Sequence, residues 1–152
     1  MGLDMHLEAR RFLWIFDDGT GKDADVGKAI RNALPEIGDM RPQGVTVEAM
    51  YWRKANAIHQ WFVDNVQDGT DDCDHYHVNR EKLEELRDLC QQVLDDRDRA
   101  AELLPTQSGF FFGGTDYDEW YWNKVQYTRD TLAKLLANEH LEGWEFYYHS
   151  SW

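Results

Sequence analysis

The sequence predicts an α+β fold: a small, mostly antiparallel sheet of about four strands packed by three to four helices, in a single domain of residues 1–152. Segments at both ends of the chain alternate apolar and polar residues, as half-buried strands do. Long central segments repeat apolar residues at every third or fourth position, as amphipathic helices do. The two patterns do not alternate regularly along the chain, which disfavours a parallel sheet.

The N-terminal third predicts two strands separated by a loop and a short helix. The first strand covers residues 2–9, where the apolar positions are Leu3, Met5, Leu7 and Ala9, and residues 12–16 extend or follow it. Residues 17–22 predict a loop, because glycine and aspartate dominate them. Asp23 or Asp25 is a suitable N-cap for a short helix that ends before Pro35. Residues 45–49 predict the second strand.

The centre of the chain predicts two amphipathic helices. The first runs from Trp52 to Gln67, and its apolar positions are Trp52, Ala55, Ile58, Phe62 and Val66. The second begins at Asn79, a good N-cap, and buries Leu83, Leu86, Leu89, Cys90, Val93 and Leu94. Residues 97–104 continue or break this helix, and Pro105 ends it.

The last third predicts a short buried strand at residues 110–112, a long helix and a closing strand. Thr115 and Asp118 resemble a capping box for a helix over about residues 116–138. Trp144, Phe146 and Tyr148 alternate with polar residues and predict the closing strand. If the first and closing strands pair, Asp4, His6, Glu8, Glu145, Tyr147 and His149 share the face away from the core. A solvated sheet face explains them without any chemistry.

Composition limits the classes of function. The formal net charge is -13, which excludes a broad, sequence-independent grip on nucleic acid, because such a grip needs a surplus of Lys and Arg. A hydrophobic fraction of 42% excludes a disordered acidic tail. We find no apolar run long enough to span a membrane and no secretory signal, so we expect a cytoplasmic protein without membrane partners. Cys73 and Cys90 are expected to be reduced thiols.

The enzyme motifs that the sequence approaches fail at essential positions. Residues 12–20 resemble an Asp-x-Asp-Gly-Thr phosphotransfer loop, but Phe16 stands where the nucleophile belongs. Gly21 and Lys22 resemble a phosphate-binding P-loop, but Asp23 replaces the Ser or Thr that binds magnesium. These failures favour a binding protein over an enzyme.

A candidate ligand site lies at the start of the helix predicted from Trp52. Arg53 and Lys54 fall in its first turn, where the helix dipole disfavours cations, so an anion is expected nearby. A phosphate is suited to that position, and Tyr51 and Trp52 can stack on an attached ring. The alternative is that Glu48 or another acidic side chain neutralises the two cations.

Asn56 and His59 extend this candidate site, since both lie within or beside the apolar arc of the helix and point inward. They can orient a ligand or transfer a proton. The alternative is that His59 bonds a backbone carbonyl in the core.

A second candidate surface lies on the long C-terminal helix. Trp120, Lys124 and Tyr127 are left outside its core stripe. They can form a stacking surface for a nucleotide or a contact patch for a protein partner. The alternative is that a second layer, such as the chain end through Trp152, covers them.

A candidate metal site is the stretch Cys73, His75 and His77. Alternate positions on an extended segment project to the same side, which suits zinc or another divalent ion. The preferred interpretation is a solvated loop that needs no cofactor.

Four segments together carry a family resemblance: residues 51–63, 2–5, 105–113 and 115–120. They resemble a family of small uncharacterised bacteriophage and prophage proteins. The resemblance supplies no catalytic residue, but it implies a host cytoplasm and an accessory role.

The resulting functional hypothesis is stoichiometric binding that antagonises a host component, either a protein or a phosphate-bearing nucleotide. The alternative is a small metal-dependent hydrolase that uses Cys73, His75 and His77.

Overall fold

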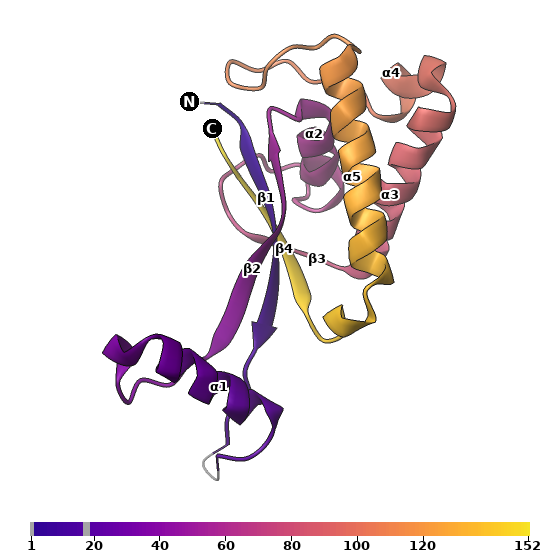
Figure 1. Ribbon diagram of the computed structural model, residues 1–152. Helices are drawn as coiled ribbons and strands as arrows, with labels where there is room; N and C mark the ends of the chain where they lie inside the picture. The colour runs from indigo at the N-terminus through magenta and orange to yellow at the C-terminus, as the bar shows by residue number, and fades with distance from the viewer. Residues whose placement is uncertain (1, 17–18) are drawn as a thin grey trace.

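An antiparallel sheet with the strand order β2-β1-β4-β3 forms the frame of the protein (Figure 1). The computed structural model describes residues 2–16 and 19–152. Within them the strands are β1 (Asp4–Phe12), β2 (Gly44–Arg53), β3 (Tyr76–Val78) and β4 (Glu145–Ser151). The first and last strands of the chain pair at the centre of the sheet, so both termini lie at the same end. This architecture confirms the predicted α+β class.

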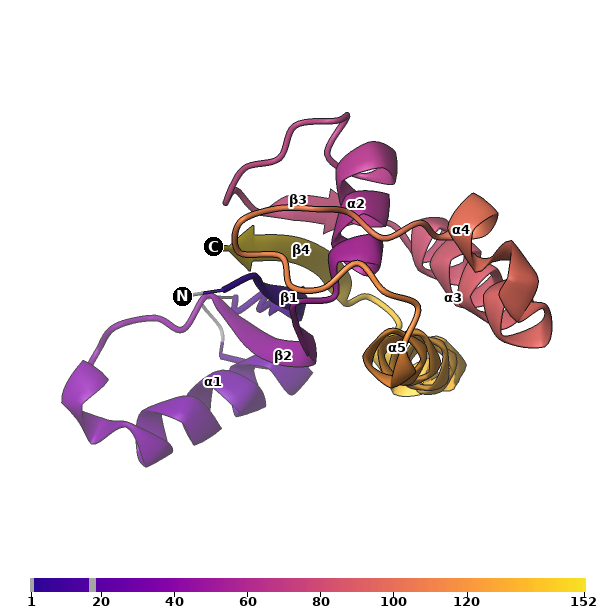
Figure 2. The same ribbon diagram turned by 90° about the horizontal axis from the view of Figure 1, so that it is seen from above.

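The described helices are α1 (Lys22–Ala33), α2 (Asn56–Asn65), α3 (Arg80–Asp95), α4 (Ala100–Leu103) and α5 (Glu119–Ala137). Short 3-10 turns follow at Pro35–Ile37, Arg97–Arg99 and Glu139–Leu141. Helices α2, α3 and α5 lie on one side of the sheet (Figure 2). We call the other side the outer face. No helix in the described part of the chain has the length and apolar composition needed to cross a membrane.

The main core lies between the inner face of the sheet and these helices. Phe62 of α2 stacks on Tyr148 of β4, with ring centroids 3.9 Å apart and planes 6° apart. Leu83 and Leu86 of α3 and Leu132 of α5 belong to the same core and are fully buried. Burial raises the pKa of the Cys90 thiol to about 12, so this cysteine is an inert core residue.

A second, smaller core stabilises what we call the arm, which consists of residues 11–16 and 19–45 and contains α1. The arm continues from β1 and β2 and points away from α2, α3 and α5 (Figure 1). Its buried members are Leu13, Ile15 and Ala24, and none of them belongs to the main core. Phe12, Trp14, Phe16 and Met40 on the arm are all more than half exposed.

Several predicted elements are confirmed where one period or one cap defines them. The alternating residues 2–9 fall within β1 and its approach, and the closing strand falls within β4. Asn79 caps α3 by accepting from the Lys82 amide at 2.9 Å. Asp118, rather than Thr115, caps α5, accepting from the Tyr121 amide at 3.1 Å. Part of the loop predicted at residues 17–22, namely Asp17 and Asp18, lies outside the described residues.

The prediction that a helix begins at Trp52 is wrong. Strand β2 runs to Arg53, and α2 begins at Asn56. Trp52 fits both the strand period of Met50 and the helix period of Ala55, so spacing could not decide. The indole donates to the Thr128 hydroxyl of α5 at 2.8 Å, which holds Trp52 in the core as a strand residue.

The prediction of a buried strand at residues 110–112 is also wrong, because this segment is a turn and Phe110 is 95% exposed. The strand that completes the four-stranded sheet is instead β3, which lies in a segment predicted to be a hydrophilic loop. Its three residues are too few for an alternating pattern to be recognised.

Helix α3 is expected to depend on its buried face. Replacing Leu86 by Ala removes a fully buried side chain and should lower the free energy of unfolding by about 2–5 kcal/mol. Leu34→Ala on the arm is the matched control, since Leu34 is 45% exposed, and it should cost much less. Urea denaturation of both variants checks this. Equal losses would contradict the placement of α3 in the core.

Candidate ligand-binding site

A cavity of about 330 Å³ lies between the end of β2, the start of α2, the loop before α5 and the first turns of α5. We call it the α2–α5 cavity. Residues from two predicted sites line it together: Arg53, Lys54 and Asn56 from the first, and Trp120 and Lys124 from the second. The sequence predicts these two sites on different helices and does not link them. The fold joins them because α5 packs beside the end of β2.

Three cationic side chains line the α2–α5 cavity: Arg53, Lys54 and Lys124. Among the described residues, no carboxylate lies within ion-pair distance of any of them. Glu48, the alternative partner named above, instead pairs with His6 Nδ1 at 2.9 Å. Two acidic residues, Asp116 and Asp118, also line the cavity. The site is therefore cationic but not purely so.

Lys124 is the most enclosed of the three cations. Its Nζ donates to the Arg53 carbonyl, which ties α5 to the end of β2. Burial lowers the pKa of Lys124, and nearby Lys54 lowers it further, while Asp118 opposes the change. A bound anion would favour the charged form of Lys124 and offset this desolvation.

The N-terminus of α2 opens on the same cavity. Residues 55–58 line it, and the N-cap Ala55 provides no side-chain acceptor. The first-turn N–H groups of an α-helix have no partner within the helix, so they and the helix dipole favour an anion at this end.

Asn56 has a structural role rather than a free binding role. Its amide Nδ2 donates to the Phe112 carbonyl at 3.1 Å and to the Gly114 carbonyl at 2.9 Å. Its Oδ1 accepts from the Gln107 amide at 3.0 Å. These three bonds fasten the loop of residues 105–118 over the start of α2. Asn56 thus shapes the cavity wall.

Gly113 explains how closely that loop approaches β2. Its φ is +87°, and a Cβ there would lie 3.2 Å from the Cβ of Lys54. Lys54 itself has a positive φ of 53°, an uncommon conformation for a non-glycine residue. A Cβ at position 113 would therefore crowd the Lys54 side chain, and the positive φ of Gly113 independently favours glycine.

The other aromatic residues of the two predicted sites lie outside the cavity lining. Trp52 is in the core, and its ring meets the edge of Tyr127 at a centroid distance of 6.4 Å. Tyr51 lies on the outer face, where its hydroxyl donates to Asp4. Trp120 alone of these aromatic residues lines the cavity, with 74% of its surface exposed. Trp152, the residue expected to cover this surface in the alternative interpretation, does not line the cavity and packs against His59 and Phe112.

His59 is fully buried and both of its ring nitrogens have partners. Nδ1 lies 2.7 Å from the Tyr148 hydroxyl, and Nε2 lies 3.0 Å from Asp71 Oδ1. Burial lowers the pKa of His59, although Asp71 opposes this, so the neutral ring is favoured. The neutral tautomer that fits donates from Nε2 to Asp71 and accepts from Tyr148. His59 therefore joins α2, β4 and the loop before β3 and does not face the cavity.

The predicted metal ligands Cys73, His75 and His77 are not brought together as a trio. Cys73 is exposed, and the ring of His77 meets the edge of Tyr147 at 5.4 Å. His75 lies instead against Glu8 and His149. Among the described residues this is the group of three whose ligand atoms come within 4.8 Å of one another.

Some lining residues were missed by sequence reasoning, including Thr106, Gly114 and Asp116. They lie on the loop whose middle was expected to be a strand. The dense glycines around residues 109–114 are the signal that could have indicated a turn there. No protein-family model, no curated protein and no solved structure matches this chain, so the site rests on its own geometry.

Replacing Asn56 by Ala should release the loop of residues 105–118. The change removes a buried side chain and leaves the partly buried Gln107 N–H and two loop carbonyls without their partner, so we expect the free energy of unfolding to fall by about 1–3 kcal/mol. Asn65→Ala is the control, because exposed Asn65 makes a single bond to the Trp61 carbonyl. Urea denaturation measures both. A loss no larger than that of the control would contradict the fastening role.

The buried His59 should make stability depend on pH. Its pKa is lowered in the folded state, so the unfolded chain takes up a proton first as pH falls below about 6.5. The free energy of unfolding should therefore fall between pH 7 and pH 5. A His59→Gln variant should show a smaller fall, with a remainder because the pKa of His149 is also lowered, mainly by burial.

His140→Gln, at an exposed position, is the control for this pH dependence and should keep the full slope. Urea denaturation of the three proteins at pH 7, 6 and 5 gives the comparison. An unchanged slope in His59→Gln would show that this histidine does not couple folding to pH.

Proposed function

We propose that the protein binds a small molecule carrying phosphate and an aromatic ring, of the nucleotide type, in the α2–α5 cavity. It acts by stoichiometric binding rather than by catalysis. The observation that carries the proposal is the convergence of Arg53, Lys54 and Lys124 with Trp120 around one cavity.

The phosphate is placed beside the start of α2. There the three cations and the uncapped first turn of α2 line one space. Cations without carboxylate partners and unpaired backbone N–H groups form an anion site together. Asp116 and Asp118 limit how much negative charge the cavity accepts, which favours one or two phosphates over a longer polyphosphate.

The aromatic part of the ligand is placed on Trp120. An indole that is 74% exposed at the opening of a cavity offers a flat surface for a base. Stacking of a base on an aromatic side chain is worth about 1–3 kcal/mol and tolerates different bases. The volume of about 330 Å³ is at the lower end for small-molecule sites, so the base extends toward the opening.

Binding is favoured over reaction because Thr106 and Asp118, two polar residues of the cavity lining, already have structural roles. The Thr106 hydroxyl donates to the Thr115 carbonyl, and Asp118 caps α5. His59, the histidine considered for proton transfer, is buried behind Phe112. The alternative hydrolase role loses its support because Cys73, His75 and His77 do not form one group.

The wider role is that of a phage-type accessory protein that antagonises a host component. It rests on the family resemblance, and capture of a host nucleotide is the form of antagonism that the cavity supports. A second candidate is docking on a host protein through the arm. It is favoured by exposed Phe12, Trp14 and Met40, which suit an apolar groove, and the net charge of -13 on the whole chain favours a partner with a basic surface.

Isothermal titration calorimetry with adenosine diphosphate tests the ligand proposal. We expect saturable binding that weakens as salt is added. Replacing Arg53, Lys54 or Lys124 by Gln should weaken it by roughly 10- to 100-fold, the worth of one charge-assisted hydrogen bond. Lys82→Gln is the control, because Lys82 pairs with Glu85 on α3, away from the cavity. This variant should bind adenosine diphosphate with unchanged affinity.

Two further titrations divide the site. Trp120→Ala should weaken the binding of adenosine diphosphate but not that of pyrophosphate, because pyrophosphate has no ring to stack on the indole. Failure of adenosine diphosphate to bind at millimolar concentration would overturn the proposal. So would binding that the three cavity variants leave unchanged.

A further inference from the structure

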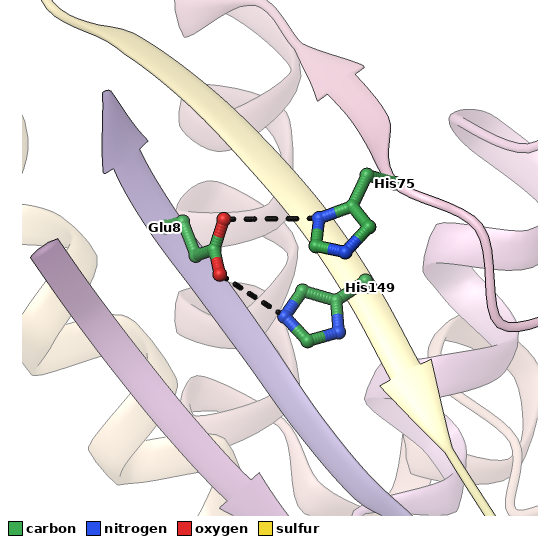
Figure 3. A group of neighbouring side chains, drawn as sticks. All are labelled: Glu8, His75 and His149. Carbon is green, nitrogen blue, oxygen red and sulfur yellow. Dashed lines mark hydrogen bonds and ion pairs between the residues drawn. The ribbon is translucent and has the colours of Figure 1, made fainter. Parts of the chain in front are cut away.

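Three potential metal ligands converge on the outer face of the sheet (Figure 3). Glu8 comes from β1, His149 from β4, and His75 stands directly before β3. One ligand atom from each lies within 4.8 Å of the other two. The three residues are far apart in the sequence, and the central pairing of β1 with β4 brings two of them together.

The separations of these atoms suit a metal ion. Glu8 Oε1 lies 3.3 Å from His149 Nε2, and Glu8 Oε2 lies 3.7 Å from His75 Nδ1. Zinc binds imidazole nitrogen and carboxylate oxygen at about 2.0–2.2 Å, so two such ligands in a tetrahedron lie roughly 3.4 Å apart. The two separations from Glu8 are therefore close to the spacing of ligands around one zinc ion, and the whole group lies within 4.8 Å.

The backbone holds the donors in position. In the β1–β4 ladder, Glu8 pairs with Tyr147 and His6 pairs with His149, so Glu8 and His149 are diagonal neighbours on one face. The ring of His6 stacks on that of His149, with centroids 4.7 Å apart and planes 11° apart. The ring centroids of His75 and His149 lie 4.0 Å apart. Glu8 and His149 are thus held by paired strands, which are more rigid than loops, while His75 directly precedes β3.

Arg10 occupies part of this cluster. Its guanidinium contacts Glu8 Oε2 at 2.7 Å and His75 Nδ1 at 2.6 Å. It also lies over the ring of Tyr147, 4.2 Å from the centroid. An incoming metal cation would displace the guanidinium from Glu8 and His75. The displaced guanidinium could keep its contact with the Tyr147 ring. Arg10 thus competes with the metal for the same donors.

We propose that Glu8, His75 and His149 form a binding site for a divalent transition metal ion such as zinc. Two imidazoles and one carboxylate suit zinc, iron, nickel or copper better than magnesium or calcium. Three protein ligands leave a coordination position for water or for a group from a partner. The site is independent of the α2–α5 cavity, which lies on the helix side of the sheet.

Titration of the metal-free protein with Zn²⁺ in a calorimeter, and with Co²⁺ followed by visible absorption, tests the site. We expect one equivalent to bind. His75→Ala, His149→Ala and Glu8→Gln should each weaken binding at least tenfold. Arg10→Gln should tighten it, because a competing cation is removed. Circular dichroism and thermal unfolding confirm that each variant is folded.

His77→Ala and Cys73→Ser are the matched controls. His77 is also on the outer face near β4 but lies against Tyr147, and Cys73 is exposed in the preceding loop. Both variants should bind Zn²⁺ as the unmodified protein does. The proposal is overturned if the folded protein binds no Zn²⁺ at micromolar concentration. It is equally overturned if these controls weaken binding as much as His75→Ala does.

Discussion

The pairing of the last strand with the first is the interaction on which the rest of the structure depends. Strand β4 lies between β1 and β3, and β3 has no other strand partner among the described residues. On its inner face β4 carries Tyr148, which stacks on Phe62 and meets the His59 ring. On its outer face it carries His149, which meets Glu8. Until the C-terminal segment is in place, β3, the anchoring of α2 and the outer-face cluster are all incomplete.

Buried polar side chains have structural roles here, and partly exposed cations are left available. A polar group removed from water must find a partner, so Asn56, His59 and the Trp52 indole are each satisfied within the fold. Asn56 joins the loop before α5 to α2, His59 joins α2 to β4, and Trp52 joins β2 to α5. Arg53 and Lys54 at the cavity had no such requirement because they are exposed to water, whereas partly buried Lys124 donates to the Arg53 carbonyl. Of the three buried polar side chains, Asn56 also shapes the wall of the α2–α5 cavity.

Much of the fold could be predicted because one period or one cap defines each element. The alternation in β1 and β4, the apolar stripe of α3 and the caps Asn79 and Asp118 depend on neighbours in sequence. The errors at residues 52–55 and 110–112 arise where tertiary bonds decide: Trp52 to Thr128, and Asn56 to the loop carbonyls. Alternation placed Glu8 and His149 on one face. It could not place His75 beside them, because the position of β3 depends on its pairing with β4.

The arm has a core that shares no buried residue with the main one, and this separation bears on how the protein can diversify. Sites without common partners contribute to stability almost additively. A substitution of Trp14 or Met40 therefore leaves the packing around β4 unchanged. Asn56 and Lys124 at the cavity and Glu8 on the outer face have less freedom, because the side chain of each bonds to another element or loop. The arm is the part of the molecule that can accumulate new surface chemistry while the rest stays fixed.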